Sequence, residues 1–215
     1  MKQITGVVLF LLVSILYCCN QKNNETKDNV TSNPKEQKND SIKENPREDL
    51  CDYEAILNDP KTPKLVKELY HNTVKKLGEP TTTYFDYLKS NNPKEKAFYF
   101  RIITNSYAFS DGAYSEELGN LGKEYVEYQT KDFASFFDNQ NCFTDDDLKT
   151  WAKIVVLEFE IIDETIETKK GEPLVNVYSR KLVGHAKGFT ENQKKTIQKF
   201  TLLLKKEWEG FVKKN

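Results

Sequence analysis

The residues that suggest chemistry gather in one segment, residues 110–117, which reads SDGAYSEE. An Asp-Gly pair is a typical end for one helix, and a serine followed by two glutamates is a typical start for the next. Backbone amides at a helix start can hold an anion. If the chain has a site for a partner, we expect it here; the alternative is a purely structural corner with Gly112 in a left-handed turn. The candidate partner-binding residues are Asp111, Gly112, Tyr114, Ser115 and Glu116.

Two of these carboxylates, Asp111 and Glu116, also raise the hypothesis of hydrolysis. A carboxylate pair can act as general acid and general base when one member lies in a pocket that raises its pKa. Tyr107 and His71 are candidate neighbours of a site in the segment 110–117. The chain has neither a Gly-x-Ser-x-Gly nucleophile motif nor a phosphate-binding Gly-x-x-x-x-Gly-Lys loop. We therefore assign no catalytic residue and favour a non-enzymatic protein, with an envelope hydrolase as the alternative.

Metal and cofactor sites are not indicated. The two histidines, His71 and His185, stand outside any His-Glu-x-x-His motif, and no Cys-x-x-Cys pair is present. The three aspartates at 145–147 match the start of a helix, where acidic side chains complement the helix dipole. Residues 138–143 lack the alternating acids and the glycine of an EF-hand loop. The sequence predicts no metal and no cofactor.

The chain has four cysteines, and two of them, Cys18 and Cys19, directly follow an apolar leader. Cys51 and Cys142 are the remaining pair, and an even pair in an exported chain most simply forms a disulfide. Such a bridge would fix the start of the folded domain to the loop before the helix at residue 144. Two separate buried thiols are the alternative.

The leader, residues 1–18, has the layout of a secretory signal peptide. Lys2 supplies the positive charge, and residues 7–16 supply an apolar run of about ten residues. A membrane-spanning helix needs about 20 apolar residues, and here polar residues follow at once. We predict cleavage rather than a retained membrane anchor.

The end of the leader resembles the lipobox of bacterial lipoproteins: Leu16 stands three places before Cys19, with the small Cys18 between them. The resemblance implies that Cys19 is lipidated, carrying a diacylglycerol thioether and acyl chains such as palmitate. Cys18 is the alternative position. Residues 20–25 (NQKNNE) are similar to the export tether of Bacteroidota lipoproteins, which implies an outer-membrane lipid anchor on the periplasmic or the cell-surface face.

Three segments follow from this pattern. Residues 1–18 are the signal peptide, and residues 19–50 are the lipidated cysteine and a disordered tether, because they hold almost no apolar side chain for a core. Residues 51–215 form the globular domain. That length suffices for one domain with a substantial core.

The globular segment predicts an all-α fold of seven or eight antiparallel helices, arranged as a bundle or a short helical array. Apolar side chains recur at helical spacing, with caps at Asn92, Thr144 and Thr190. Residues 154–162 are rich in β-branched residues and are the one segment with a strand alternative. The predicted helices are 63–77, 82–89, 93–109, 113–128, 130–137, 144–166, 174–186 and 191 onward.

A net charge of -1 gives no electrostatic case for nucleic acid. The leading hypothesis is a lipid-anchored envelope protein that binds an unidentified envelope protein or a glycan. Its layout resembles that of small immunity proteins and accessory subunits of the envelope, by analogy rather than by a shared motif. A structural spacer without a ligand is a third possibility.

Overall fold

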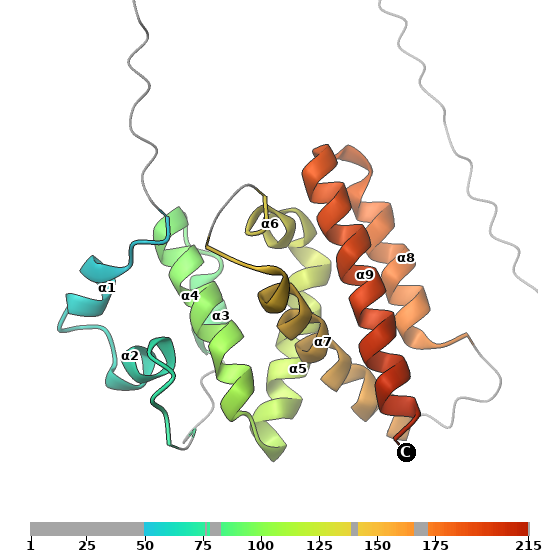
Figure 1. Cartoon of the computed structure of the whole chain (residues 1–215), viewed down its shortest axis with the longest axis horizontal. Coiled ribbons are helices and arrows are strands. Elements are labelled where there is room, and N and C mark those ends of the chain that lie inside the picture. Colours follow the sequence, from blue (N-terminus) through green and yellow to red (C-terminus); the bar gives the residue numbers. More distant parts are fainter. Residues whose placement is uncertain (1–49, 76, 78–82, 139–141, 166–171, 215) are drawn as a thin grey trace, which may run out of the picture. The chain divides into compact units, whose positions relative to one another are not determined.

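The computed structural model describes residues 50–75, 77, 83–138, 142–165 and 172–214, and all regular structure in these ranges is helical. The described residues belong to one compact unit. The predicted all-α class is confirmed, and the helices lie side by side as an array (Figure 1). The signal peptide, Cys19 and the tether fall on residues 1–49, outside the described residues. The α-helices of the described ranges are α1 Glu54–Asn58, α2 Lys64–Tyr70, α3 Tyr84–Tyr87, α4 Pro93–Ser106, α5 Gly112–Tyr128, α6 Thr130–Ser135, α7 Asp145–Thr165, α8 Leu174–His185 and α9 Glu191–Val212.

Three helices begin at the caps that the sequence predicts. Thr144 starts α7, because its hydroxyl accepts from the Asp147 amide at 3.3 Å. The Asn92 side chain accepts hydrogen bonds from the backbone amides of Lys94 and Glu95, at 3.0 and 3.2 Å, and so starts α4. Thr190 and Gln193 form a reciprocal capping box at the start of α9. Each cap satisfies amide groups that a helix leaves without partners at its first turn.

The predicted helix 63–77 is wrong in its second half, because α2 ends at Tyr70. Asn72 adopts the left-handed conformation with φ 55°, and the Thr73 amide donates to the Glu68 carbonyl at 2.9 Å. This is the hydrogen-bond pattern of a Schellman cap, in which asparagine can replace glycine. The helical spacing of the apolar residues that follow therefore does not extend α2. A further difference is the short helix α1, which the sequence analysis did not predict.

The core lies where α4, α6, α7 and α9 meet. Phe100, Phe133, Trp151 and Phe200, one from each helix, are fully buried. The rings of Phe100 and Trp151 stack with centroids 4.5 Å apart, and those of Phe133 and Phe200 meet edge to face at 4.8 Å. The Trp151 indole donates to the Thr104 hydroxyl at 2.8 Å, so the one polar atom of the ring is satisfied. Residues 154–162 belong to α7, so the helical prediction for this segment is confirmed and the strand alternative is wrong.

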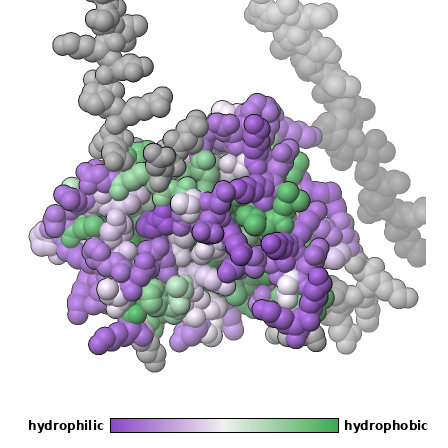
Figure 2. Space-filling view, viewed as in Figure 1, coloured by the Kyte–Doolittle hydropathy of each residue, from purple (hydrophilic) through white to green (hydrophobic). Residues whose placement is uncertain are grey.

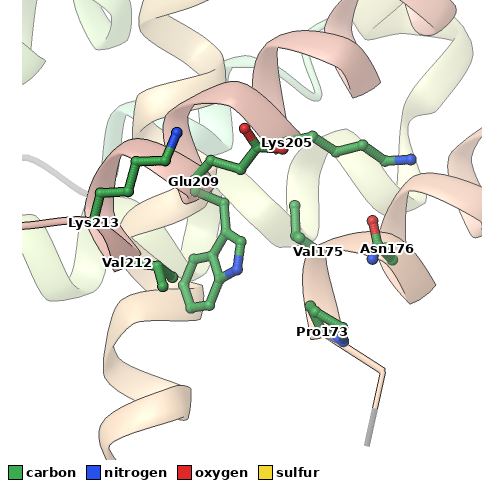
Figure 3. A pocket seen from close by; sticks show the side chains of 8 residues that line it. Pro173, Val175, Asn176, Lys205, Glu209, Val212 and Lys213 are labelled. Atoms are coloured by element: carbon green, nitrogen blue, oxygen red, sulfur yellow. The ribbon is translucent and has the colours of Figure 1, made fainter. Parts of the chain in front are cut away.

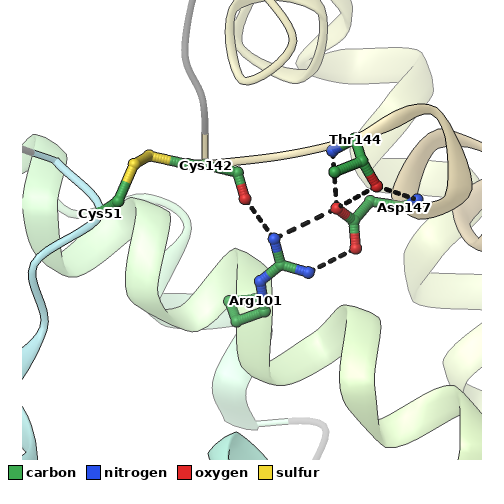
Figure 4. The surroundings of a disulfide bond; sticks show 5 residues. All are labelled: Cys51, Arg101, Cys142, Thr144 and Asp147. Atoms are coloured by element: carbon green, nitrogen blue, oxygen red, sulfur yellow. Dashed lines mark hydrogen bonds and ion pairs between the residues drawn. A yellow bond between two sulfur atoms is a disulfide. The ribbon is translucent and has the colours of Figure 1, made fainter.

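The disulfide lies beside an ion pair that holds the start of α7 (Figure 4). Cys51 and Cys142 are joined as the sequence predicts, with Cα atoms 5.2 Å apart and 91 positions between them in sequence. Arg101 of α4 binds both carboxylate oxygens of Asp147 and donates to the Cys142 carbonyl. Asp147 also accepts from the Thr144 amide at 2.7 Å. The N-terminal segment, α4 and α7 are thereby connected at one point.

Helices α8 and α9 form one end of the array, and α1 and α2 form the other (Figure 1). α8 packs mainly on α9, so both helices keep a face that no other described helix covers. No helix of the described ranges is long and apolar enough to cross a membrane.

Candidate functional site

Tyr128 is the most exposed large apolar side chain of the described residues, with 72% of its surface accessible. It ends α5, and Gln129 separates α5 from α6. The Thr130 hydroxyl donates to the backbone carbonyls of Val126 and Glu127, both at 2.9 Å. These bonds fix the corner between the two helices, so Tyr128 projects from a defined position.

Two hollows meet at this corner. The first has a volume of about 380 Å³ and lies between α3 and α5, and the second, of about 560 Å³, lies between the corner and the end of α8. Tyr128 and Gln129 line both hollows, which therefore form one continuous surface, called here the Tyr128 surface. Its other principal residues are Phe85, Asp86 and Lys89 near α3, Leu121, Glu124 and Tyr125 of α5, and Lys131, Asp132, His185 and Phe189 around the second hollow.

Tyr125 lines the first hollow and has an unsatisfied polar group that is itself buried. Its side chain is 8% exposed, and its hydroxyl has no hydrogen-bond partner among the described residues. Burial raises the pKa of Tyr125, with the Asp132 carboxylate as a smaller cause, so the hydroxyl stays neutral. An unpaired buried hydroxyl costs about 1–3 kcal/mol. Such groups are rare in folded proteins, and each one calls for a physical explanation.

His185 brings an imidazole to the second hollow. Its Nδ1 atom lies 3.1 Å from the Glu127 carbonyl oxygen and 3.2 Å from the Thr130 hydroxyl oxygen. A carbonyl only accepts, so the bond to Glu127 requires Nδ1 to carry the proton. In the neutral ring Nε2 is then the acceptor, and the side chain is exposed. His185 can therefore accept a hydrogen bond from a bound partner.

The carboxylates of the second hollow are already paired. Lys96 donates to Asp132 at 2.7 Å, and Lys181 pairs with Glu127. The surface therefore offers aromatic, amide and imidazole groups rather than a free carboxylate pair. This composition suits recognition of a partner better than hydrolysis.

The predicted segment 110–117 lies at the opposite end of α5, where Gly112 is about 24 Å from Tyr128 by the rise of a helix. Of its five candidate binding residues, Asp111, Gly112 and Glu116 are exposed, Ser115 is half-buried and Tyr114 is buried. Tyr114 donates to the Ser106 hydroxyl at 2.8 Å, while Gly112 has φ 26°. The junction between α4 and α5 therefore has the left-handed Gly112 that the structural alternative predicts.

Asp111 and Glu116, the candidate carboxylate pair, are both exposed. A carboxyl group that acts as a general acid needs a desolvated setting, and exposure does not provide it. The two proposed neighbours have other contacts: the His71 ring meets Tyr70 edge to face at 5.1 Å, and the Tyr107 ring lies 5.9 Å from the Lys153 ammonium. No observation favours hydrolysis at this segment.

Within the described ranges, no three His, Cys, Asp or Glu side chains are grouped so that they could hold a metal ion. His185 belongs to the Tyr128 surface. No local sequence pattern indicates this, because its partners Glu127 and Thr130 lie 58 and 55 positions earlier in the chain.

Comparison with known proteins returned no match. No protein-family model, no curated protein and no solved structure is similar to this chain. The function is therefore argued from the residues alone.

Proposed function

We propose that this protein is a lipid-anchored bacterial envelope protein whose helical domain binds another envelope protein through the Tyr128 surface. The observation that supports the proposal is an aromatic side chain, 72% exposed, between two hollows. Tyrosine is among the residues that contribute most to protein interfaces, because it offers a large apolar ring and a polar tip at a low entropy cost. An immunity protein or an accessory subunit would use such a surface.

The two hollows give this surface room for side chains of the partner. Phe85 and Leu121 supply apolar walls on one side of Tyr128, and His185 and Asp132 supply polar groups on the other. Known interfaces have this layout, with an apolar centre and a polar rim. A glycan is the alternative partner, since sugar rings also stack on exposed tyrosine.

Attachment to the membrane is proposed from Leu16, Cys18 and Cys19. Two or more acyl chains, at about 0.8 kcal/mol for each buried methylene, anchor a protein stably. Radiolabelled palmitate fed to cells should label the wild-type chain and not the Cys19→Ala variant. If label persists in Cys19→Ala and is lost in Cys18→Ala, the modified residue is Cys18. If neither substitution removes label, or the wild type takes up none, the anchor proposal is wrong.

The binding proposal is tested by capture from envelope extracts with immobilised protein. Tyr128→Ala should reduce capture of a specific protein by about tenfold, because a central aromatic residue typically contributes 1–2 kcal/mol or more. Lys64→Ala is the control, since Lys64 is 90% exposed and lies on α2, outside the Tyr128 surface and away from α8 and α9. Equal capture by wild type and Tyr128→Ala would contradict the proposal. Capture that depends on Tyr128 but resists protease treatment of the extract would indicate a glycan.

A further inference from the structure

The α8–α9 end of the array is strongly basic. Residues 172–214 contain ten lysines or arginines and four glutamates, a net charge of +6, whereas the whole chain has a net charge of -1. The remainder of the chain is therefore acidic. We call the exposed basic and apolar side chains of residues 172–214 the basic layer.

Most of this charge is free to act on a partner. Arg180, Lys181, Lys194 and Lys199 pair with nearby carboxylates. Six lysines of the basic layer form no ion pair with a described residue and are exposed. They are Lys187, Lys195, Lys205, Lys206, Lys213 and Lys214.

Apolar side chains are interspersed among these lysines. Of the six large apolar side chains exposed in the described ranges, four belong to α8 and α9: Val177, Val183, Leu202 and Val212. Leu202 is 68% exposed, and helical spacing places it beside Lys195, Lys199 and Lys206 on the outer side of α9. Figure 2 shows a small hydrophobic patch over α9, surrounded by hydrophilic surface.

A hollow of about 300 Å³ lies between the start of α8 and the end of α9 (Figure 3). Trp208 of α9 lines the hollow together with Val175 and Pro173 at the start of α8, which gives it an apolar floor. Lys205 and Lys213 stand at its rim, with Glu209 between them on the same helix. An apolar floor with a cationic rim fits a molecule that has an apolar part and an anionic group.

The residue types favour a lipid surface over a protein as the occupant. Nine of the ten basic residues are lysine, and lysine is depleted at protein interfaces, whereas arginine and aromatic residues are enriched there. Clustered lysines with exposed aliphatic neighbours are typical of segments that bind the anionic surface of a bilayer. The Tyr128 surface has the opposite composition and is assigned to a protein partner.

We infer that the basic layer docks on an anionic lipid bilayer, with the hollow beside Trp208 receiving part of an anionic lipid. The two helices provide the charge, and Leu202, Val212 and the hollow provide apolar contact. This binding does not depend on lipidation at Cys19, and it holds or fails independently of the partner proposed for Tyr128.

The inference is tested with the mature chain, residues 19–215, carrying Cys19→Ser, so that neither an acyl chain nor the apolar leader contributes to binding. Flotation should recover more protein with POPC vesicles that contain POPG than with POPC vesicles alone, and added salt should weaken this difference. Reversing three lysines (Lys195→Glu, Lys205→Glu and Lys206→Glu) should weaken binding to POPG vesicles by about tenfold or more. The matched control reverses Lys61, Lys64 and Lys75, which are exposed and lie outside the basic layer.

Tryptophan emission tests the hollow separately. The chain has two tryptophans, and Trp151 is fully buried in the core, so a spectral change on binding POPG vesicles should come from Trp208. Trp208→Phe should abolish this change while flotation still reports binding. A change that persists in Trp208→Phe would exclude the hollow as the lipid site.

Three results would overturn the inference. The first is equal binding to vesicles with and without POPG. The second is equal loss of binding in the two triple variants, which would show that only net charge matters. The third is binding to poly-L-glutamate without binding to POPG vesicles, which would make the partner an acidic polypeptide.

Discussion

A Cβ atom on Gly119 of α5 would lie 2.9 Å from the backbone nitrogen of Glu158 in α7. Real Cβ contacts essentially never come this close, and the backbone of a long helix cannot yield as a side chain can. Gly119→Ala should therefore force α5 and α7 apart. We expect a loss of about 1–3 kcal/mol in the free energy of unfolding, measured by urea titration.

Gly210 of α9 is the matched control for this substitution. Nothing lies within 4 Å of a Cβ placed there. Gly210→Ala should raise the free energy of unfolding by about 0.5–1 kcal/mol, because alanine is the better helix former. If both variants were stabilised, the close approach of α5 and α7 would be wrong.

Much of the fold follows from local sequence signals. Asn92 and Thr190 mark the starts of α4 and α9 because their side chains bond to amides only two or three residues away. The apolar stripe of α7 predicts which of its side chains are buried, and Leu148, Trp151 and Phe159 are among them. Caps and helical periodicity act within one helix, so the sequence shows them directly.

The Tyr128 surface could not be predicted in this way. Its first hollow depends on how α3 packs against α5, and its second depends on the end of α8, 57 positions after Tyr128. Tyr128 is also the last residue of a predicted helix whose other tyrosines, Tyr114 and Tyr125, are buried. Helical spacing alone therefore assigns it to the core. The composition of the segment 110–117 suggests a binding site, but its Tyr114 is buried and donates to the Ser106 hydroxyl inside the protein.

The pair between Arg101 and Asp147 should contribute strongly to stability. Both side chains are mostly buried, and the Arg101 guanidinium also binds the Cys142 carbonyl. Arg101→Met would leave the Asp147 charge without its main partner, so the free energy of unfolding should fall by about 2–4 kcal/mol. The control is Lys64→Met, because Lys64 pairs with Glu68 at the surface and is 90% exposed. Its effect should stay below about 0.5 kcal/mol; equal effects would contradict the assignment.

The disulfide between Cys51 and Cys142 closes a long loop, with 91 positions between its ends. Its removal in the double variant Cys51→Ser and Cys142→Ser frees the unfolded chain, which should lower the free energy of unfolding by about 4–5 kcal/mol in the chain-entropy account. Denaturant unfolding of the double variant and of the wild type, with and without reductant, measures this. A wild type that is insensitive to reductant would argue against the bridge.

The Tyr125 hydroxyl is buried without a partner among the described residues, so its removal should not harm the fold. Tyr125→Phe keeps the ring and should raise the free energy of unfolding by about 1 kcal/mol, or the melting temperature by about 2–4 °C. Tyr178→Phe is the matched control, because the buried Tyr178 hydroxyl donates to the Lys123 carbonyl at 2.8 Å. The free energy of unfolding of Tyr178→Phe should instead fall by about 1 kcal/mol. A loss of stability in both would show that Tyr125 has a partner.

Tyr84 should make the fold sensitive to alkaline pH. Burial, followed by its neighbours Tyr114 and Tyr87, raises the pKa of Tyr84 to about 12, against 10.0 for the free side chain. Between these values the unfolded chain is ionised at this position while the folded chain keeps its proton, so unfolding releases a proton.

The contribution of Tyr84 to the free energy of unfolding is therefore complete below pH 10. It falls as the pH rises toward 12, by at most about 1.4 kcal/mol per pH unit. Lysines titrate in the same range, and comparison with Tyr84→Phe removes their contribution. Urea unfolding of the two proteins across this range should give a steeper fall for the wild type, because only the wild type can ionise at this position. Parallel curves would mean that Tyr84 titrates alike in the folded and unfolded states, which would contradict its burial at 8% exposure.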